Sequence, residues 1–146
     1  MANNGKQYSV ENLGALNSWG RHSFTHSAFP KPIPGKKFVK DALGLSGMEI
    51  SFNTVPGHGA IPFYHKHNAN EELYLFLAGR GEMQVDDQTF AVSEGSAVRV
   101  APAGKRAWRN TSDDALVFVV IQARAGTLPR GDISDGEVIS GDVIWP

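Results

Sequence analysis

Two histidines and a glutamate stand close together in the sequence, and their types and spacing could form a metal site. His65 and His67 alternate along a predicted strand, so both imidazoles lie on one face, with their Cα atoms about 6.6 Å apart. After a polar turn the chain continues into residues 71–77, where the spacing places Glu72 on the face of the histidines. Two imidazoles and one carboxylate with open positions suit non-haem Fe(II), and Mn, Ni, Co or Zn could also bind.

The histidine pair by itself is a weak signal, because a His-x-His tripeptide easily occurs by chance in a chain with five histidines. The polar residues 68–70 and Glu71 are equally well explained as a solvent-exposed turn. Glu72 is harder to explain in this way, since it shares its side of the strand with Tyr74 and Phe76, and an inward carboxylate is costly without compensation. Two imidazoles and a cation would compensate it.

Short strands must position these residues, because 16 glycines and 8 prolines interrupt the chain too often for long helices. Asp86 and Asp87 are typical of a two-residue hairpin turn. Eight short strands indicate an all-β domain, either a closed barrel or a sandwich. The predicted strands are Met48–Val55, Ile61–His67, Glu71–Leu77, Glu82–Val85, Thr89–Val92, Ala97–Ala101, Arg106–Asn110 and Leu116–Gln122.

The segments on either side of these strands differ in composition. Residues 1–47 contain a cluster of proline and glycine at 30–35 and only short apolar pieces, so we expect an N-terminal arm packed on the barrel. The barrel itself is expected to span residues 48–123. Residues 124–146 are rich in glycine and aspartate, and we expect a C-terminal tail that Trp145 docks.

The composition argues against several classes of protein. The 14 basic and 15 acidic residues give a net charge of −1 without a basic block, so we expect no nucleic-acid partner. The longest apolar run, Leu116–Ile121, is far shorter than the roughly 20 residues of a membrane-spanning helix, so we expect no membrane span. We also expect a cytoplasmic protein, because there is no cysteine and no apolar stretch after the polar start.

The spacing around the predicted ligands resembles the first signature motif of the cupins. The resemblance covers roughly residues 48–122, and it implies a single double-stranded β-helix, which is a jelly-roll-like barrel. It also implies that His65, His67 and Glu72 are three metal ligands inside that barrel. The matching positions read Gly59-x5-His65-x-His67-x4-Glu72-x6-Gly79.

The second cupin motif is similar in outline but lacks its histidine. That motif is usually written Gly-x5-Pro-x-Gly-x2-His-x3-Asn, and Ala107 stands here at the nominal place of the histidine. The one-residue displacement could also turn Ala107 outward, which would make Arg106 or Trp108 the inward neighbour. The matching positions read Gly95-x6-Pro102-x-Gly104-x2-Ala107-x2-Asn110, and the candidates for a substitute ligand are Gln122, His22 and His26.

Alternation along residues 71–77 also predicts which side chains face outward. If Glu72 points into the barrel, Leu73, Leu75 and Leu77 point out of it. A strand that is apolar on both faces needs a cover on its outer face, either from the arm or from a second subunit. We therefore expect a symmetric homodimer.

A ligand pocket is expected on the inner face of the same strands. Arg99, Arg106 and Arg109 are candidates for a cation that recognises an anionic ligand, although arginines on strands more often lie on the outer, solvated face. The candidate pocket residues are Tyr74, Phe76, Arg106, Trp108 and Gln122.

Two classes of function remain open from the sequence. In the first, the barrel is a metal-dependent enzyme that acts on a small polar molecule, and the resemblance to cupins implies dioxygenase, isomerase or decarboxylase chemistry. In the second, the barrel is a non-catalytic or metal-free cupin that binds a small ligand or serves a structural role. Replacement of the motif-two histidine at Ala107 favours this second class.

Overall fold

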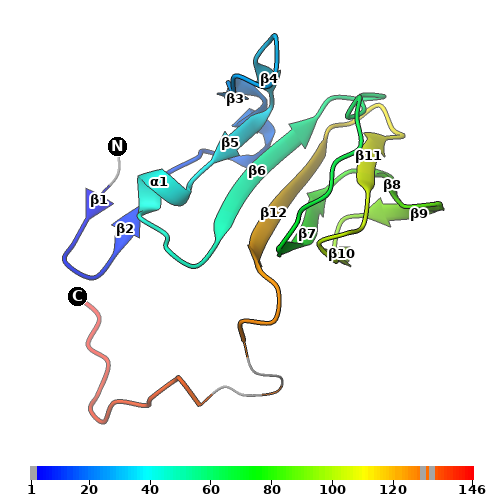
Figure 1. The fold of residues 1–146 in the computed structure, drawn as a ribbon. Helices are drawn as coiled ribbons and strands as arrows, with labels where there is room; N and C mark the ends of the chain where they lie inside the picture. The colour runs from blue at the N-terminus through cyan, green and yellow to red at the C-terminus, as the bar shows by residue number, and fades with distance from the viewer. Residues whose placement is uncertain (1–2, 129–130, 132–133) are drawn as a thin grey trace.

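The computed structural model describes residues 3–128, 131 and 134–146, and its regular structure is almost entirely antiparallel β (Figure 1). This confirms the predicted all-β class. Among the described residues, no helix has the length and apolar character needed to cross a bilayer. The elements are β1 (Asn3–Asn4), β2 (Ser9–Val10), the 3-10 helix η1 (Leu16–Arg21), β3 (Ser23–Phe24), β4 (Ile33–Pro34), β5 (Lys36–Phe38), α1 (Lys40–Leu43), β6 (Glu49–Val55), β7 (Asn70–Ala78), β8 (Arg80–Val85), β9 (Gln88–Ser93), β10 (Ala97–Val100), β11 (Arg106–Asn110) and β12 (Leu116–Arg124).

Two antiparallel sheets enclose the hydrophobic core. The larger has the strand order β10-β7-β12-β6-β5, and the smaller has the order β11-β8-β9. Strands β7 and β12 form the longest pairing of the larger sheet, with a register irregularity between Val117 and Phe118. Both sheets contribute to the core, whose buried members are Tyr74, Phe76, Met83, Val92, Val100, Leu116, Phe118 and Val120.

Two turns of the barrel need the residue types that the sequence supplies at them. Asp86 and Asp87 form the two-residue connection between β8 and β9, and Asp86 adopts a positive φ of 52°. Gly79 lies between β7 and β8 with φ at 81°, and a Cβ there would lie 2.3 Å from the backbone oxygen of Ala115. Only glycine satisfies both conditions at this last position of the first motif.

One predicted strand is present in a weaker form. In place of a continuous strand over Ile61–His67, the structure has two isolated bridges, Ala60 with Arg109 and His65 with Arg106. Pro62 lacks the N–H that a ladder requires, which explains why the pairing does not continue between the two bridges. The segment still runs beside β11 and therefore holds its side chains in a fixed place.

The N-terminal residues contribute one strand to the larger sheet. β5 pairs with β6 in the register Lys36 opposite Asn53 and Phe38 opposite Ser51. The η1 helix packs on the outer face of the same sheet, where the Trp19 ring lies edge-on to Phe52 at 4.9 Å between centroids. The polypeptide before residue 48 therefore takes part directly in the barrel wall.

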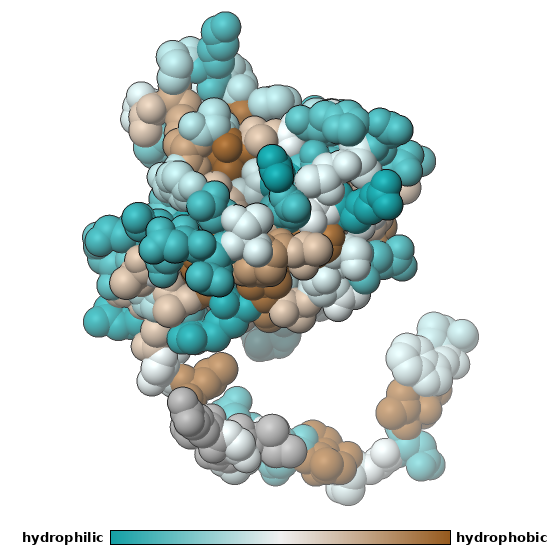
Figure 2. Space-filling view, turned by 90° about the vertical axis from the view of Figure 1, so that its right-hand side faces the viewer, coloured by the Kyte–Doolittle hydropathy of each residue, from teal (hydrophilic) through white to brown (hydrophobic). Residues whose placement is uncertain are grey.

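The C-terminal residues extend away from the barrel (Figures 1 and 2). The expectation that Trp145 docks the tail is wrong, because its side chain is 84% exposed, and Val143 and Ile144 are exposed as well. A short apolar triplet next to glycine, aspartate and proline buries too little surface to offset the conformational entropy lost when the tail is ordered.

Candidate metal centre

The three predicted ligands come from β7 and from the connection that precedes it. Glu72 lies on the inner face of β7, while His65 and His67 lie in the connection of residues 56–69 between β6 and β7. The backbone of His65 exchanges two hydrogen bonds with Arg106 on β11, and the His67 N–H donates to the Pro102 oxygen at 2.9 Å. These bonds fix His65 against β11 and His67 against the connection between β10 and β11.

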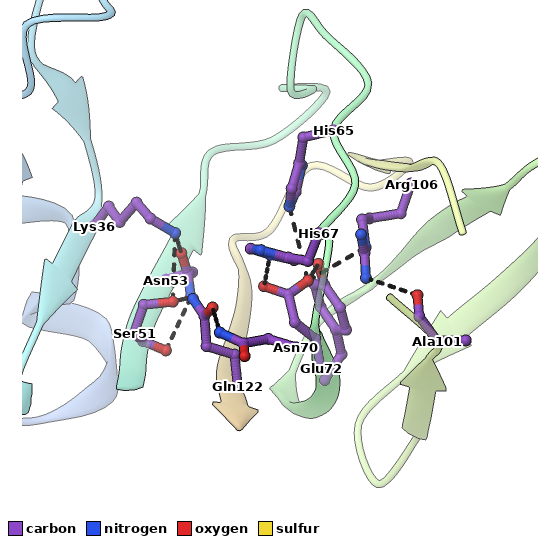
Figure 3. Close-up of polar contacts among 11 residues, drawn as sticks. Lys36, Ser51, Asn53, His65, His67, Asn70, Glu72, Ala101, Arg106 and Gln122 are labelled. Atoms are coloured by element: carbon purple, nitrogen blue, oxygen red, sulfur yellow. Dashed lines mark hydrogen bonds and ion pairs between the residues drawn. The ribbon is translucent and has the colours of Figure 1, made fainter. Parts of the chain in front are cut away.

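The ligand atoms of the three residues converge (Figure 3). His67 Nε2 lies 3.0 Å from Glu72 Oε1, and His65 Nε2 lies 3.7 Å from Glu72 Oε2. One ligand atom from each residue lies within 4.8 Å of the other two. The imidazoles are 28% and 25% exposed, whereas the carboxylate is only 6% exposed, so the cluster lies inside the barrel but still reaches solvent.

The carboxylate has two further partners on its Oε2 atom. The Tyr74 hydroxyl donates to Oε2 at 2.6 Å, and Arg106 Nε lies 3.3 Å from the same oxygen. Burial raises the pKa of Glu72, but contacts with His65 and Tyr74, and the charges of His67 and Arg106, outweigh it and lower the pKa to about 2. Glu72 is therefore ionised at neutral pH. Burial and the neighbouring carboxylate raise the pKa of Tyr74, which stays a hydroxyl donor.

This donor set fits a divalent transition metal. Imidazole nitrogen and carboxylate oxygen are common ligands of Fe, Mn, Ni, Co and Zn. The Tyr74 hydroxyl donates a hydrogen bond to Glu72 Oε2 and Arg106 forms an ion pair with the same oxygen, and outer-shell partners of this kind orient a ligating carboxylate in metalloproteins. The residues present would supply three protein ligands and leave other coordination positions open.

Arg106 occupies the inward position that the sequence left open. Its side chain is 0% exposed, and Nη2 donates to the Ala101 oxygen at 3.3 Å. Ala107 lies opposite Gln84 on the other face of the smaller sheet, where it lines a surface hollow together with Arg109. The one-residue displacement in the second motif therefore turns the side chain of residue 107 outward. The Arg106 guanidinium faces the site in its place.

The other two candidate arginines lie outside the barrel. Arg99 Nε donates to Glu71 Oε2 at 2.6 Å, and Arg109 Nε donates to Glu82 Oε2 at 2.7 Å, with both arginines mostly exposed. The solvent-facing interpretation of strand arginines therefore holds for this pair. It is wrong for Arg106, because residues 106 and 109 lie on opposite faces of β11.

Of the remaining pocket candidates, Tyr74, Phe76 and Trp108 are aromatic residues in or against the core, and Gln122 is polar. Tyr74 and Phe76 are buried, and the Trp108 ring lies 5.8 Å from that of His65 and 5.7 Å from that of Tyr74. Gln122 lies opposite Glu72 in the sheet register, and its Oε1 accepts a hydrogen bond from Asn70. Tyr74 and Trp108 therefore adjoin the cluster, whereas Phe76 belongs to the core and Gln122 is bonded to Asn70.

No substitute for the missing fourth ligand joins the cluster in the described part of the chain. His22 Nε2 lies 3.3 Å from the Leu13 oxygen, and His26 Nδ1 accepts from the Ala28 N–H. Among the described residues, His65, His67 and Glu72 are the one group of histidine and carboxylate side chains close enough to share an ion.

One polar residue of the interior was missed from sequence. Lys36 on β5 donates from Nζ to Asn53 Oδ1 at 2.7 Å, and Figure 3 shows its amine on the side of the cluster opposite Arg106. An arm expected over residues 1–47 gives no reason to place a lysine inside the barrel. The only signal was its alternation with Phe38, which is too short a pattern to define a strand.

Comparison with protein families agrees with this architecture. Residues 51–122 match the family described as Cupin domain. A crystal structure of a cupin protein from Bacteroides fragilis is 36% identical, with a TM-score of 0.68, and the match covers 72% of this chain and 89% of that chain. The family match over residues 51–122 includes both histidines of the connection and β11.

Two further relatives are more limited in what they share. A putative sugar phosphate isomerase from Acidithiobacillus ferrooxidans is 24% identical with a TM-score of 0.60, over 77% of this chain and 74% of that chain, and this is a likeness of fold alone. An uncharacterized protein of Methanocaldococcus jannaschii is 39% identical over 44 residues, which is 30% of this chain. This chain covers 35% of the length of that curated relative.

Proposed function

The chain belongs to the cupin superfamily, and from this premise we propose that its barrel binds a divalent metal through His65, His67 and Glu72 and binds or transforms a small polar molecule there. The observation that carries the proposal is the convergence of three ligand atoms within 4.8 Å. When bound, such a metal orients a substrate, acts as a Lewis acid or activates dioxygen.

The chain's own residues would keep that site in a defined state. Tyr74 and Arg106 hold Glu72 Oε2 and leave Oε1 beside His67. The backbone bonds between His65 and Arg106 fix the first imidazole against β11. Dioxygenase, isomerase and decarboxylase activities are all compatible with this arrangement, and so is ligand binding without turnover.

The Arg106–Glu72 pair favours a second candidate function. A guanidinium next to the carboxylate neutralises part of its charge without a metal. The barrel could therefore be a metal-free cupin that binds a small ligand. The two candidates differ in one measurable property, since only the first requires an ion for ligand binding.

A homodimer in the cytoplasm completes the proposal. Leu77 is 37% exposed on the outer face of β7, and Leu73 and Leu75 on the same face are only half-buried. A second subunit would cover this row. Light scattering at micromolar concentration should give about twice 15.8 kDa, and a monodisperse monomer would contradict the dimer.

The expectations of a small-molecule partner and of no nucleic-acid partner rest on the polar interior and on the net charge of −1.

The decisive experiment is a metal titration of the tag-free full chain after chelation. Calorimetry with Fe(II), Mn(II), Co(II), Ni(II) and Zn(II) should detect binding to the wild type, and His67→Ala should weaken it by more than about tenfold, because one of three protein ligands is lost. His58→Ala is the matched control, since His58 is exposed and pairs with Asp113. If the wild type binds none of these ions near neutral pH, the metal proposal fails.

A further inference from the structure

Lys36 projects into the same space as the metal ligands. It lies opposite Asn53 on β6, and Asn53 lies opposite Phe118 on β12, whose neighbour on β7 is Phe76. Phe118 and Phe76 belong to the buried core, so this row of the sheet faces the interior. Lys36 therefore points inward on the face that carries Glu72, although it comes from outside the part of the chain that matches the cupin family.

The neighbours of the Lys36 ammonium are neutral groups. Nζ donates to Asn53 Oδ1 at 2.7 Å and, at the longer distance of 3.4 Å, to Ser51 Oγ. The same nitrogen lies 4.8 Å from the centre of the Phe38 ring. An ammonium has three N–H donors, and these contacts use two of them. Within the described residues, no carboxylate forms an ion pair with Lys36 inside 4.0 Å.

The two carboxylates whose charges act on Lys36 have other partners. Glu72 contacts His67 and Tyr74, and it pairs with Arg106. Glu49 Oε1 accepts the backbone N–H groups of Lys40 and Ile50. Burial lowers the pKa of Lys36 to about 8 even though both carboxylates act in the opposite direction, so their attraction does not compensate the loss of water.

The opposite wall of the site has a second cation that is not fully satisfied. Arg106 is 0% exposed, and its Nε and Nη1 atoms have no hydrogen-bond partner. Figure 3 shows Lys36 and Arg106 on opposite sides of the His67–Glu72 pair, with both charged ends directed toward it. A polar interior of this kind is costly unless a ligand completes it.

We propose that Lys36 is an anion-binding residue, and that its ammonium holds a carboxylate or phosphate group of a small ligand lying between β5 and His67. Lys36 and His67 are both partly exposed on this side, whereas Arg106 is enclosed. Arg106 contributes through its charge and through its hold on Glu72. The inference deepens the function proposed above by naming a ligand class, and it does not require the metal itself.

Lys37 provides a matched control next to this residue in the sequence. Its side chain belongs to the other face of β5, where Nζ lies 3.9 Å from Glu11 Oε1. Removing its amine changes the net charge by the same amount as removing that of Lys36. A difference between the two variants therefore reports on the interior position and not on the overall charge of the protein.

The experiment is an anion titration of the full chain by calorimetry, with and without bound metal. The probes are malonate, inorganic phosphate and, as an uncharged comparison, malonamide. We expect wild type and Lys37→Met to bind one of the two anions but not malonamide. Lys36→Met should bind it about tenfold more weakly or worse, and Lys36→Arg should recover binding because it keeps the charge. The preferred probe distinguishes a carboxylate ligand from a phosphate ligand.

Several outcomes would overturn the proposal. These are failure of the wild type to bind both anions, equal binding by Lys36→Met, or an equal loss in Lys37→Met. If circular dichroism shows that Lys36→Met does not fold, the test is made on the wild type by NMR. Addition of the anion must then change the amide chemical shifts of Lys36, Ser51 and Asn53. If Lys36→Met still binds metal but no longer binds the anion, the result supports both the metal site and the anion-binding role of Lys36. Anion binding through Lys36 in a wild type that takes up no metal contradicts only the metal function.

Discussion

Arg106 Nε lies 3.3 Å from Glu72 Oε2, and this contact places a permanent positive charge beside a candidate metal ligand. Both side chains are buried, so neither charge is screened by bulk water. The guanidinium and a bound metal would act on the same carboxylate from different sides. The affinity of the site for a metal therefore depends on Arg106 as well as on the ligands.

Replacing this arginine by histidine should tighten metal binding. Arg106→His removes the competing charge and adds an imidazole on the inner face of β11, so we expect affinity to rise by about tenfold or more. Ala107→His is the control, because residue 107 faces outward opposite Gln84 and its imidazole cannot reach the cluster. Calorimetric titration checks both variants, and tighter binding by Ala107→His alone would show that the register of β11 is different.

Removing the carboxylate should destabilise the fold. Glu72→Ala leaves the Arg106 guanidinium buried without its charge partner, which we expect to cost about 3–5 kcal/mol of unfolding free energy. Glu82→Ala removes the partner of Arg109, whose side chain is 63% exposed, and should cost less than about 1 kcal/mol. Urea denaturation of the metal-free proteins measures both, and similar losses would contradict the buried character of the Arg106–Glu72 pair.

Lys36 should make stability depend on pH in the alkaline range. Its pKa is about 8 in the folded protein and 10.5 in the unfolded chain, so the unfolded state binds more protons between these values. The free energy of unfolding should therefore rise by about 3 kcal/mol as the pH increases from about 8 to about 10.5. Below pH 8 the cost of burying the charged amine is constant, so Lys36 adds no pH dependence there.

The comparison of variants isolates that effect from the other titrating groups. Lys36→Met should flatten the rise in denaturation midpoint over this range, whereas Lys37→Met should keep it. The charged groups that act on the Lys36 amine are Glu72 on β7 and Glu49 on β6. An unchanged pH profile in Lys36→Met would mean that this amine is fully solvated in solution.

Fluorescence should report the exposure of the C-terminal residues. Trp145 is 84% exposed, while Trp19 is 5% exposed and Trp108 packs against His65 and Tyr74. Trp145→Phe should reduce quenching by acrylamide and shift the emission maximum to shorter wavelengths, and Trp19→Phe should do the opposite. No change in Trp145→Phe would indicate that the tail docks on the protein in solution.

The strands and the ligand cluster were accessible from sequence because each is encoded locally. Alternation and turn residues predict β6 to within one residue and β11 exactly where the structure places it, Arg106–Asn110. The spacing of His65, His67 and Glu72 brings them together once the turn at residues 68–70 joins the histidine segment to β7. Local patterns of this kind survive folding because each strand has one buried face.

The inward position on β11 and the role of β5 depend on pairings that the sequence does not encode locally. A shift of one residue exchanges Arg106 for Ala107 on the inner face, and only the register opposite Val85 and Gln84 determines which of them points inward. Lys36 lies on a strand of three residues, and its position is set by pairing with Asn53, which is 17 positions away in the sequence.

The pairing of β5 with β6 also bears on how this protein avoids self-assembly. β6 has alternating buried and outward side chains, and its outward Ile50 and Phe52 are apolar. Without β5, the backbone donors and acceptors on that side of β6 would form an open edge able to pair with another chain. A fragment trimmed to the family-matching residues 51–122 would expose this edge and lose the Lys36 amine at once. β5 therefore protects the edge of β6 from pairing with another chain, and it also carries the lysine of the proposed ligand site.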